Sequence, residues 1–237
     1  EREAMAQLHR VVYGFDGRFY ERRARDPGCV LGTFASGGTA ANLTALWAAR
    51  NRALGPKTDG TGTDGGGFAG VEEEGMHAAL KHHGYEGAAI VGSALLHYSV
   101  GKAAGVLGLG SRSLIEIPYD DEFRVRTDLM ERALEDCKNR GILVLAVVGL
   151  AGATETGSVD DLRTLAALAR KHGAHFHVDA AWGGPLAFSR RHRPLLDGIE
   201  LADTVTLDGH KQLYMPMGCG MCFYRDPELC RAASPTA

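Results

Sequence analysis

The chain has 237 residues, a formal net charge of −3 at pH 7 and five cysteines in no regular spacing. This length supports one large domain or two small ones with a buried core. There is no basic cluster, and no apolar run approaches the ~18 residues that cross a bilayer, which argues against nucleic acid and membranes as partners. The odd, scattered cysteines do not form a disulfide framework, so we expect a reducing, cytoplasmic setting.

Apolar, β-rich runs alternate with segments of helical period along the chain. The predicted helices are Ala40–Leu54, Glu72–His83, His97–Leu107, Thr127–Arg140 and Asp160–His172. The predicted strands are Ala88–Ser93, Ser113–Ile117, Ile142–Leu150, His175–Val178, Thr204–Leu207 and Gly220–Tyr224. This alternation predicts an α/β fold built from βαβ units, with a mostly parallel sheet flanked by helices.

Several of these elements carry signals at their ends. The run Ile142–Leu150 is apolar at successive positions, which is typical of a central strand buried on both faces of a parallel sheet. Gly141 and Gly173 stand where a helix would end just before a strand. Thr127 and Asp160 are the expected N-caps of the two helices that start there.

The segment 55–70 is rich in Gly, Thr and Asp and predicts a mobile surface loop. Its letters from Gly60 to Gly65 match G-x-G-x-x-G, but the match neither follows a strand nor opens a helix. It therefore does not predict a dinucleotide site. The nucleophile elbow G-x-S-x-G is also missing, because Phe34 stands where the first glycine before Ser36 would be.

A glycine-containing turn, Ser36-Gly37-Gly38-Thr39, precedes the predicted helix at Ala40. Glycines allow close backbone approach, and a helix N-terminus offers unpaired N–H groups and the positive end of a dipole. Ser36 and Thr39 add hydroxyl groups, so this turn is a candidate phosphate-binding site. A plain loop-to-helix turn explains the same letters and stays open.

His97 follows the predicted strand Ala88–Ser93 and opens the run His97-Tyr98-Ser99-Val100-Gly101-Lys102-Ala103-Ala104. A side chain at the carboxyl end of a parallel strand faces the usual ligand crevice of such sheets. The alternative is a structural histidine that caps the following helix.

His175, His177 and Asp179 alternate along one predicted strand and share a face, which suggests a metal site. Same-face neighbours on a strand lie ~6.6 Å apart and the outer pair ~13 Å apart, whereas all ligands of one zinc ion lie ~2 Å from it. Strand geometry therefore excludes a single metal ion held by these three side chains.

Cys219 and Cys222 form a C-x-x-C on a predicted strand. Residues three apart on a strand point to opposite faces, so neither a disulfide nor a shared zinc ion is favoured. We expect buried thiols without a redox role.

Two strand ends carry the residues that indicate the chemistry. Asp179 directly follows the predicted strand His175–Val178, and His210-Lys211 follows the next, Thr204–Leu207. This is the layout that holds pyridoxal phosphate. A lysine amine bonds to the cofactor aldehyde, and a carboxylate keeps the pyridine nitrogen protonated so that the ring accepts electrons.

Taken together, four ordered motifs resemble the group II pyridoxal-phosphate-dependent amino-acid decarboxylases, which have the aspartate-aminotransferase fold (fold type I). The motifs are Ser36-Gly37-Gly38-Thr39-Ala40-Ala41-Asn42, His97 to Ala104, His177-Val178-Asp179-Ala180-Ala181-Trp182-Gly183-Gly184 and Asp208-Gly209-His210-Lys211. The resemblance runs from about Leu31 to about Arg225. Within the family, the segment from Lys211 to Gly218 looks most like the bacterial aspartate/glutamate decarboxylases.

The resemblance implies a role for each matching residue. Lys211 would carry the cofactor, and Asp179 would pair with its pyridine nitrogen. His97 would stack on one face of the ring and Ala181 would pack on the other. The further cofactor-binding positions that it implies are Ser36, Gly38, Thr39, Thr154, Asp208 and His210, and no metal is implied.

Two departures from the family pattern bear on substrate preference while leaving the cofactor site credible. The family usually has Gly-Thr-Thr where this chain has Gly152-Ala153-Thr154. It more commonly has Asn-Pro where this chain has Asp208-Gly209 before His210.

The resemblance also predicts the organisation of the protein. Residues 1–30 would be a partial N-terminal helical segment and residues 31–230 the cofactor-binding large domain. The chain starts inside a polar, helix-like stretch and stops shortly after a predicted strand, so we expect a piece of a longer, homodimeric protein. The family's C-terminal small domain, and the loop tyrosine that protonates the carbanionic intermediate, would lie beyond Ala237.

The expected function is decarboxylation of an L-amino acid, glutamate or aspartate, to an amine and CO₂. Two kinds of alternative stay open. One is another fold type I enzyme: an aromatic-amino-acid decarboxylase, a carbon–carbon lyase or an aminotransferase. The histidine before Lys211 favours a decarboxylase, since many aminotransferases lack it. The other alternative is an inactive cofactor-binding fragment.

Overall fold

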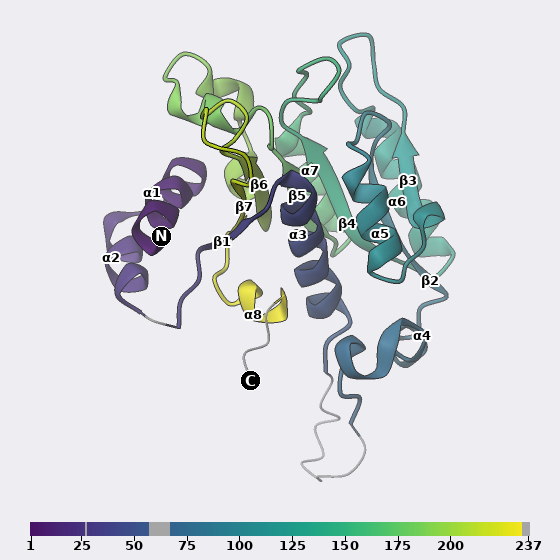
Figure 1. Cartoon of the computed structure of the whole chain (residues 1–237). Coiled ribbons are helices and arrows are strands. Elements are labelled where there is room, and N and C mark those ends of the chain that lie inside the picture. Colours follow the sequence, from purple (N-terminus) through teal and green to yellow (C-terminus); the bar gives the residue numbers. More distant parts are fainter. Residues whose placement is uncertain (27, 57–66, 234–237) are drawn as a thin grey trace.

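A seven-stranded sheet with helices on both faces forms the centre of the molecule (Figure 1). The computed structural model describes residues 1–26, 28–56 and 67–233. The strands, in the order in which they lie in the sheet, are β1 (Gly32–Ala35), β7 (Gly220–Tyr224), β6 (Thr204–Asp208), β5 (His175–Asp179), β4 (Ile142–Leu150), β2 (Gly87–Ser93) and β3 (Leu114–Ile117). The α-helices are α1 (Arg2–Tyr13), α2 (Gly17–Arg25), α3 (Gly38–Ala53), α4 (Val71–His83), α5 (Ser99–Val106), α6 (Thr127–Asn139), α7 (Leu162–Lys171) and α8 (Leu229–Ala233).

Strand direction brings the carboxyl ends of most strands to one edge of the sheet. Strands β3, β2, β4, β5 and β6 are parallel, whereas β7 is antiparallel to both β6 and β1. Because β7 reverses between them, β1 points the same way as β6. The chain leaves β1 at this edge and enters α3 directly (Figure 1).

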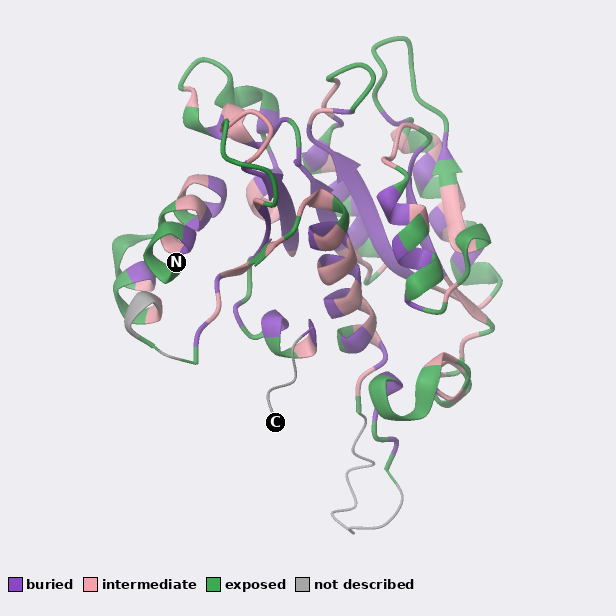
Figure 2. Cartoon of the chain, viewed as in Figure 1, coloured by how far each residue is buried: buried purple, intermediate pink, exposed green. Residues whose placement is uncertain are grey.

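Both faces of the sheet are covered, as the apolar run of β4 predicts. Val147 packs in the core shared with α1, α6 and α7, whereas its neighbour Val148 packs in the core shared with α3 and α5. Figure 2 shows the centre of the sheet buried while α4 is largely exposed. Cys219 and Cys222 pack against different core clusters. Cys222 is buried as expected, whereas Cys219, just before β7, is only half-buried.

The predicted elements are present with small shifts. Each predicted strand is found within one residue of its expected ends, and each predicted helix within two. Strand β1 was not predicted, because it has only four residues and its sequence does not alternate. It pairs with β7, far along the chain, and that pairing is invisible in local sequence.

The prediction that Asp160 caps a helix is wrong. Asp160 is buried, and its two carboxylate oxygens accept hydrogen bonds from the backbone N–H groups of Val125 and Leu150, each at 2.8 Å. Burial raises the pKa of this carboxyl group. The next residue, Asp161, caps α7 by accepting from the N–H of Thr164 at 3.0 Å. One aspartate therefore joins two loops to the sheet while its neighbour starts the helix.

At the other helix ends, one prediction fails and one is confirmed. Thr127 is the first residue of α6 rather than its cap, and Arg126 at the cap position makes no side-chain capping bond. Gly141 and Gly173 follow α6 and α7 with φ values of 67° and 65°. Only glycine adopts this left-handed region without strain, so each helix ends where its glycine stands.

The G-x-G-x-x-G letters between Gly60 and Gly65 lie outside the described residues. Among the helices that the structure describes, none is long and apolar enough to span a membrane.

Candidate active site

A pocket of about 360 Å³ opens at the sheet edge where β1, β4, β5 and β6 end. This volume lies within the range of small-molecule sites. All ten of the residues predicted for the site line it: Ser36, Gly38, Thr39, His97, Thr154, Asp179, Ala181, Asp208, His210 and Lys211. They come from five separate chain segments that only the fold brings together.

Lys211 lies in a tight turn after β6, with its amine in the pocket. Its Nζ is 3.1 Å from Oδ2 of Asp208, the last residue of that strand. The Asp208 side chain is 2% exposed, whereas that of Lys211 is 32% exposed, so the amine is the accessible partner of the pair. The other oxygen, Asp208 Oδ1, is buried and has no hydrogen-bond partner in the described part of the chain. The carboxylate therefore has one unsatisfied acceptor oxygen in the interior of the protein.

His210 contacts the same carboxylate from beside the lysine. Its Nδ1 accepts the backbone N–H of Cys219 at 3.3 Å, which leaves Nε2 as the protonated nitrogen of the neutral ring. That Nε2 faces Asp208 Oδ2 at 3.6 Å. The turn is held by a 2.7 Å bond from the N–H of Gly209 to the carbonyl of Cys219. An alanine at 209 would place its Cβ 2.7 Å from Cys219 Sγ, so glycine fits where the family more commonly has proline.

Asp179 ends β5 with both carboxylate oxygens fixed by donors. Oδ2 accepts from Nδ2 of Asn42 at 2.8 Å, and Oδ1 accepts from the backbone N–H of Ala181 at 3.1 Å. Each carboxylate oxygen has a second lone pair, so the group can accept one more hydrogen bond from a partner in the pocket. Asn42 also lines the pocket and was not predicted as a site residue. A polar residue on an otherwise apolar, buried helix face is the signal that could have found it.

The start of α3 supplies the opposite wall. No side chain caps this helix, so its first N–H groups are left to a ligand or to solvent. A Cβ added at Gly38 would lie 2.8 Å from Asp208 Oδ2 and 3.3 Å from Cβ of Ala181. One at Gly220 would lie 2.5 Å from the backbone of Gly37. The glycines thus allow the turn to lie directly against β7 and the lysine segment.

His97 lies at the rim, just before α5, and both sequence interpretations describe part of its position. It lines the pocket, and its Nδ1 accepts the backbone N–H of Ser99 at 3.3 Å, as a helix-capping group would. Ser99 Oγ is also 2.8 Å from the same nitrogen. Since Nδ1 acts as an acceptor, Nε2 carries the hydrogen and is free to face the pocket.

Thr154 and Trp182 complete the wall from the loops that follow β4 and β5. The two loops lie in contact, because a Cβ on Gly152 would be 2.7 Å from the backbone nitrogen of Gly183. Thr154 is exposed, and nothing in the sequence pointed to Trp182 beyond its place in a motif.

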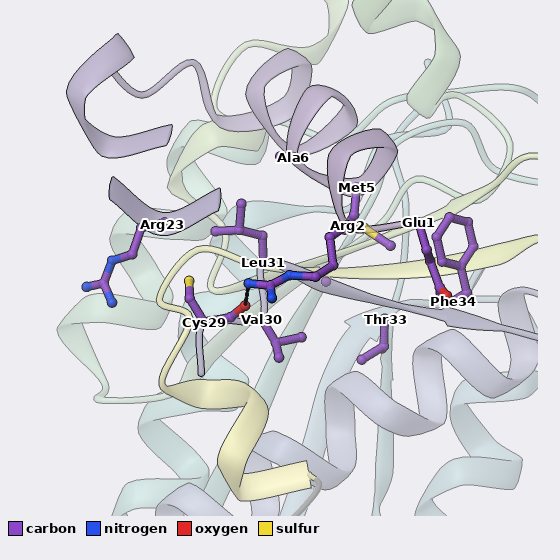
Figure 3. A pocket seen from close by; sticks show the side chains of 11 residues that line it. Glu1, Arg2, Met5, Ala6, Arg23, Cys29, Val30, Leu31, Thr33 and Phe34 are labelled. Atoms are coloured by element: carbon purple, nitrogen blue, oxygen red, sulfur yellow. Dashed lines mark hydrogen bonds between the residues drawn. The ribbon is translucent and has the colours of Figure 1, made fainter. Parts of the chain in front are cut away.

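A second pocket, of about 440 Å³, lies between α1 and β1 (Figure 3). Its lining includes Met5, Leu31 and Phe34, with Arg2 directed at the carbonyl of Cys29 at 3.4 Å. It contains none of the residues that the motifs single out. The chemistry-bearing side chains are therefore concentrated at the carboxyl edge of the sheet.

The fold and this edge define the large domain of a fold type I pyridoxal-phosphate enzyme. The pyridoxal-dependent decarboxylase conserved domain matches residues 23–235, and the chain belongs to that family.

Similar proteins agree with this assignment. The chain is 49% identical over 229 residues to aspartate 1-decarboxylase of Aliivibrio fischeri, covering 97% of this chain and 40% of that protein. It is 32% identical over 196 residues to L-2,4-diaminobutyrate decarboxylase of Acinetobacter baumannii, covering 82% of this chain and 37% of the relative. The crystal structure of mouse CSAD superposes with a TM-score of 0.81 at 30% identity, covering all of this chain and 43% of that one. The chain thus spans about two fifths of the length of these relatives.

The residues at the pocket fit pyridoxal phosphate. An accessible lysine, a buried carboxylate with lone pairs to spare and an uncapped helix start surround one space. These donors and acceptors match a cofactor with an aldehyde, a basic ring nitrogen and a phosphate.

Proposed function

We propose that this chain carries the cofactor site of a pyridoxal-phosphate-dependent decarboxylase that converts an acidic L-amino acid to its amine and CO₂. The single observation that carries the proposal is the pocket where Lys211 and Asp179, from the ends of neighbouring strands, face one space. The 49% identity to a protein named aspartate 1-decarboxylase favours aspartate over glutamate as the substrate.

In this proposal, Lys211 bonds to the cofactor and Asp179 pairs with the ring nitrogen. His97 and Ala181 take the two faces of the ring. The phosphate group would be held by Ser36, Gly38, Thr39 and His210. Thr154 and Asp208 would contact other parts of the cofactor. When bound there, pyridoxal phosphate supplies an electron sink for the electrons of the bond between Cα and the departing carboxylate.

Charged and polar side chains act on the ring nitrogen of the bound cofactor and on the amine of Lys211. The anionic Asp179 favours a proton on the ring nitrogen, since a positive charge beside a buried carboxylate is stabilised. Asp208 Oδ2 lies 3.1 Å from the ammonium of Lys211 and orients it until the cofactor arrives. His210 Nε2–H approaches the same oxygen and can share that charge when the lysine moves away.

We also propose a homodimer in which a second copy covers the pocket mouth. Large apolar side chains lie exposed there, including Tyr214 at 92% and Met217 at 85%. An exposed apolar cluster beside a site favours a protein partner. A cytoplasmic setting is supported by five cysteines that all remain free thiols. Residues 31–230 would form the large domain, with residues 1–30 as a helical segment packed on it.

Reduction with borohydride tests the cofactor assignment. After incubation with pyridoxal phosphate, the label should map to the peptide that contains Lys211, and Lys211→Ala should abolish it. Lys102, whose amine lies 4.4 Å from the ring centroid of Tyr98 near the rim, provides the matched control variant Lys102→Ala. A label that persists in Lys211→Ala would refute the site.

Release of CO₂ from aspartate, glutamate and 2,4-diaminobutyrate, compared side by side, tests the reaction and its substrate. Release from aspartate above the other two is the expected result. Cofactor labelling at Lys211 without any CO₂ release would instead support the alternative of a cofactor-binding fragment without activity.

A further inference from the structure

The amide of Asn42 lies in the pocket wall and makes hydrogen bonds to three other side chains. Its Nδ2 donates to Asp179 Oδ2 at 2.8 Å and to Ser99 Oγ at 3.0 Å. Its Oδ1 lies 3.0 Å from Nε2 of His177. Asn42 is 1% exposed, so these protein groups replace water around the amide. A carboxylate can only accept, and therefore the nitrogen of the amide must face Asp179.

This orientation fixes the hydrogens of the next residues in turn. Because Asn42 Oδ1 is an acceptor, His177 Nε2 must carry the hydrogen between them. His177 Nδ1 is then an acceptor, and the Thr204 hydroxyl, 2.8 Å away, donates to it. The Thr204 oxygen in turn accepts from Nε2–H of His175 at 2.8 Å. Every hydrogen in the series therefore points toward Asp179.

Both imidazoles are neutral in this arrangement. Burial lowers the pKa of His177 and of His175 to about 4. Two neighbours act against burial at His177, because Asp179 and the backbone of Thr204 both raise its pKa. At His175, Asp203 raises the pKa, whereas His177 and Arg52 lower it. Neutral rings have one donor and one acceptor each, which is what a series with a single direction requires.

We propose that Asn42, His177, Thr204 and His175 form a directed hydrogen-bond relay that fixes the Asp179 carboxylate in the orientation in which it meets the ring nitrogen of the bound cofactor. His177 is the central positioning residue of this relay. Aligned hydrogen bonds polarise one another in a low-dielectric interior, so the last donor, Asn42 Nδ2, is a stronger donor than an isolated amide. The relay rests on the proposed function for its role, but its geometry exists without cofactor.

The second arm of Asn42 couples the relay to the other side of the pocket. Ser99 Oγ accepts from Asn42 and is left with its own hydrogen to donate to His97 Nδ1. One amide therefore orients both the carboxylate expected at the ring nitrogen and the imidazole expected on the ring face. Loss of His177 would release Asn42 to rotate and disturb both groups.

Nitrogen NMR of the histidine rings in the cofactor-free protein tests the relay directly. His177 and His175 should both show the Nε2–H tautomer and remain neutral from about pH 8 down to about pH 5, where an ordinary histidine titrates. An Nδ1–H tautomer at His177, or protonation of its ring near its ordinary pKa, would overturn the relay.

Variants test its effect on the cofactor. In His177→Phe, which leaves Asn42 Oδ1 without a donor and the Thr204 hydroxyl hydrogen without an acceptor, we expect pyridoxal phosphate to bind about tenfold more weakly or worse. The nitrogen shift of labelled cofactor should also move toward the unprotonated pyridine value. His177→Gln, which keeps a donor for Asn42, should recover most of both properties. His172→Phe is the matched control, since its ring is 4% exposed but its Nε2 has no hydrogen bond in the described chain.

The outcomes separate this inference from the proposed function. Borohydride labelling of Lys211 in all three variants, with the ring-nitrogen shift altered only in His177→Phe, supports the relay. An unchanged affinity and nitrogen shift in a folded His177→Phe refutes it. If Lys211 is not labelled even in the unaltered protein, the proposed function fails, while the tautomer measurement still decides whether the relay exists.

Discussion

The substitution Asp179→Asn separates the charge of this side chain from its size. In the native site both carboxylate oxygens accept hydrogen bonds, from Asn42 Nδ2 and from the N–H of Ala181. An amide has only one oxygen, so its NH₂ must face one of these donors. Turning Asn42 over does not relieve the conflict, because its amide is also bonded to Ser99 and His177.

The expected loss of stability follows from the number of hydrogen-bond acceptors that the side chain loses. One buried hydrogen bond is replaced by a donor–donor contact, which costs about 1–3 kcal/mol in the free energy of unfolding. For a chain of this size, that corresponds to a Tm lower by roughly 2–12 °C. The substitution should also slow the reaction, since a neutral amide does not stabilise a protonated ring nitrogen. We expect turnover to fall at least ~100-fold, which is ~2.7 kcal/mol of barrier.

Two measurements check this reasoning on the intact enzyme. Thermal unfolding without cofactor reports the hydrogen-bond cost, and CO₂ release at saturating cofactor reports the electronic cost. Asp161→Asn provides a control, because that carboxylate caps α7 at the surface and does not line the pocket. Near-native turnover of Asp179→Asn with cofactor bound would refute the assigned role, whatever happens to the Tm.

Three further predictions follow from the same structure. Gly220→Ala should weaken pyridoxal phosphate binding at least ~10-fold and destabilise the fold by about 1–3 kcal/mol, because its Cβ would lie 2.5 Å from the backbone of Gly37. The control is Gly105→Ala in α5, where a Cβ would meet open space, so binding should be unchanged and stability slightly higher. Equal effects of Gly220→Ala and Gly105→Ala would contradict the close approach of β7 to Gly37. Burial lowers the pKa of His9 from 6.5 to about 4, so the unfolded chain binds more protons in that window. The contribution of His9 to stability should therefore be fully present above pH 6.5 and fall by about 3 kcal/mol toward about pH 4, in addition to the loss that His175 and His177 cause over the same range. The urea midpoint of His9→Phe should accordingly fall less steeply with pH than that of the unaltered protein. Asn42→Asp should weaken cofactor binding more than Asn42→Ala, because it sets a second carboxylate against Asp179, and the reverse order would count against an anionic Asp179.

Helix ends and a buried strand could be predicted from short stretches of sequence. Gly141 and Gly173 predicted the ends of α6 and α7, and the apolar run of β4 predicted a strand buried on both faces. That the ten candidate site residues line one pocket was also predictable, since they stand in recognisable motifs at the ends of predicted strands.

Hydrogen bonds and strand pairing between residues far apart in the chain could not be predicted from the sequence. Asp160 has the letters of a helix cap, but its carboxylate bonds to Val125 and Leu150, which only the folded chain brings near it. Asn42 is one polar residue on a helix, and its role emerges from contacts with residues 57 and 137 positions away. Strand β1 is too short to predict alone and exists because β7 pairs with it.

The position of β7 has a consequence for how the site forms during synthesis. Thr33 on β1 and Tyr224 on β7 are 191 residues apart, yet their hydroxyl groups lie 3.3 Å from one another. The turn from Ser36 to Gly38 emerges early from the ribosome, but the strand against which it lies emerges after nearly all the rest of the chain described here. Contacts of such long range form slowly, and the partly made sheet exposes its edge to other chains meanwhile. A nascent chain that stops before Gly220 would therefore contain Lys211 and Asp179, but its turn from Ser36 to Gly38 would lack the strand against which it lies. If that turn binds the cofactor phosphate as proposed, cofactor binding should begin only once β7 has been inserted.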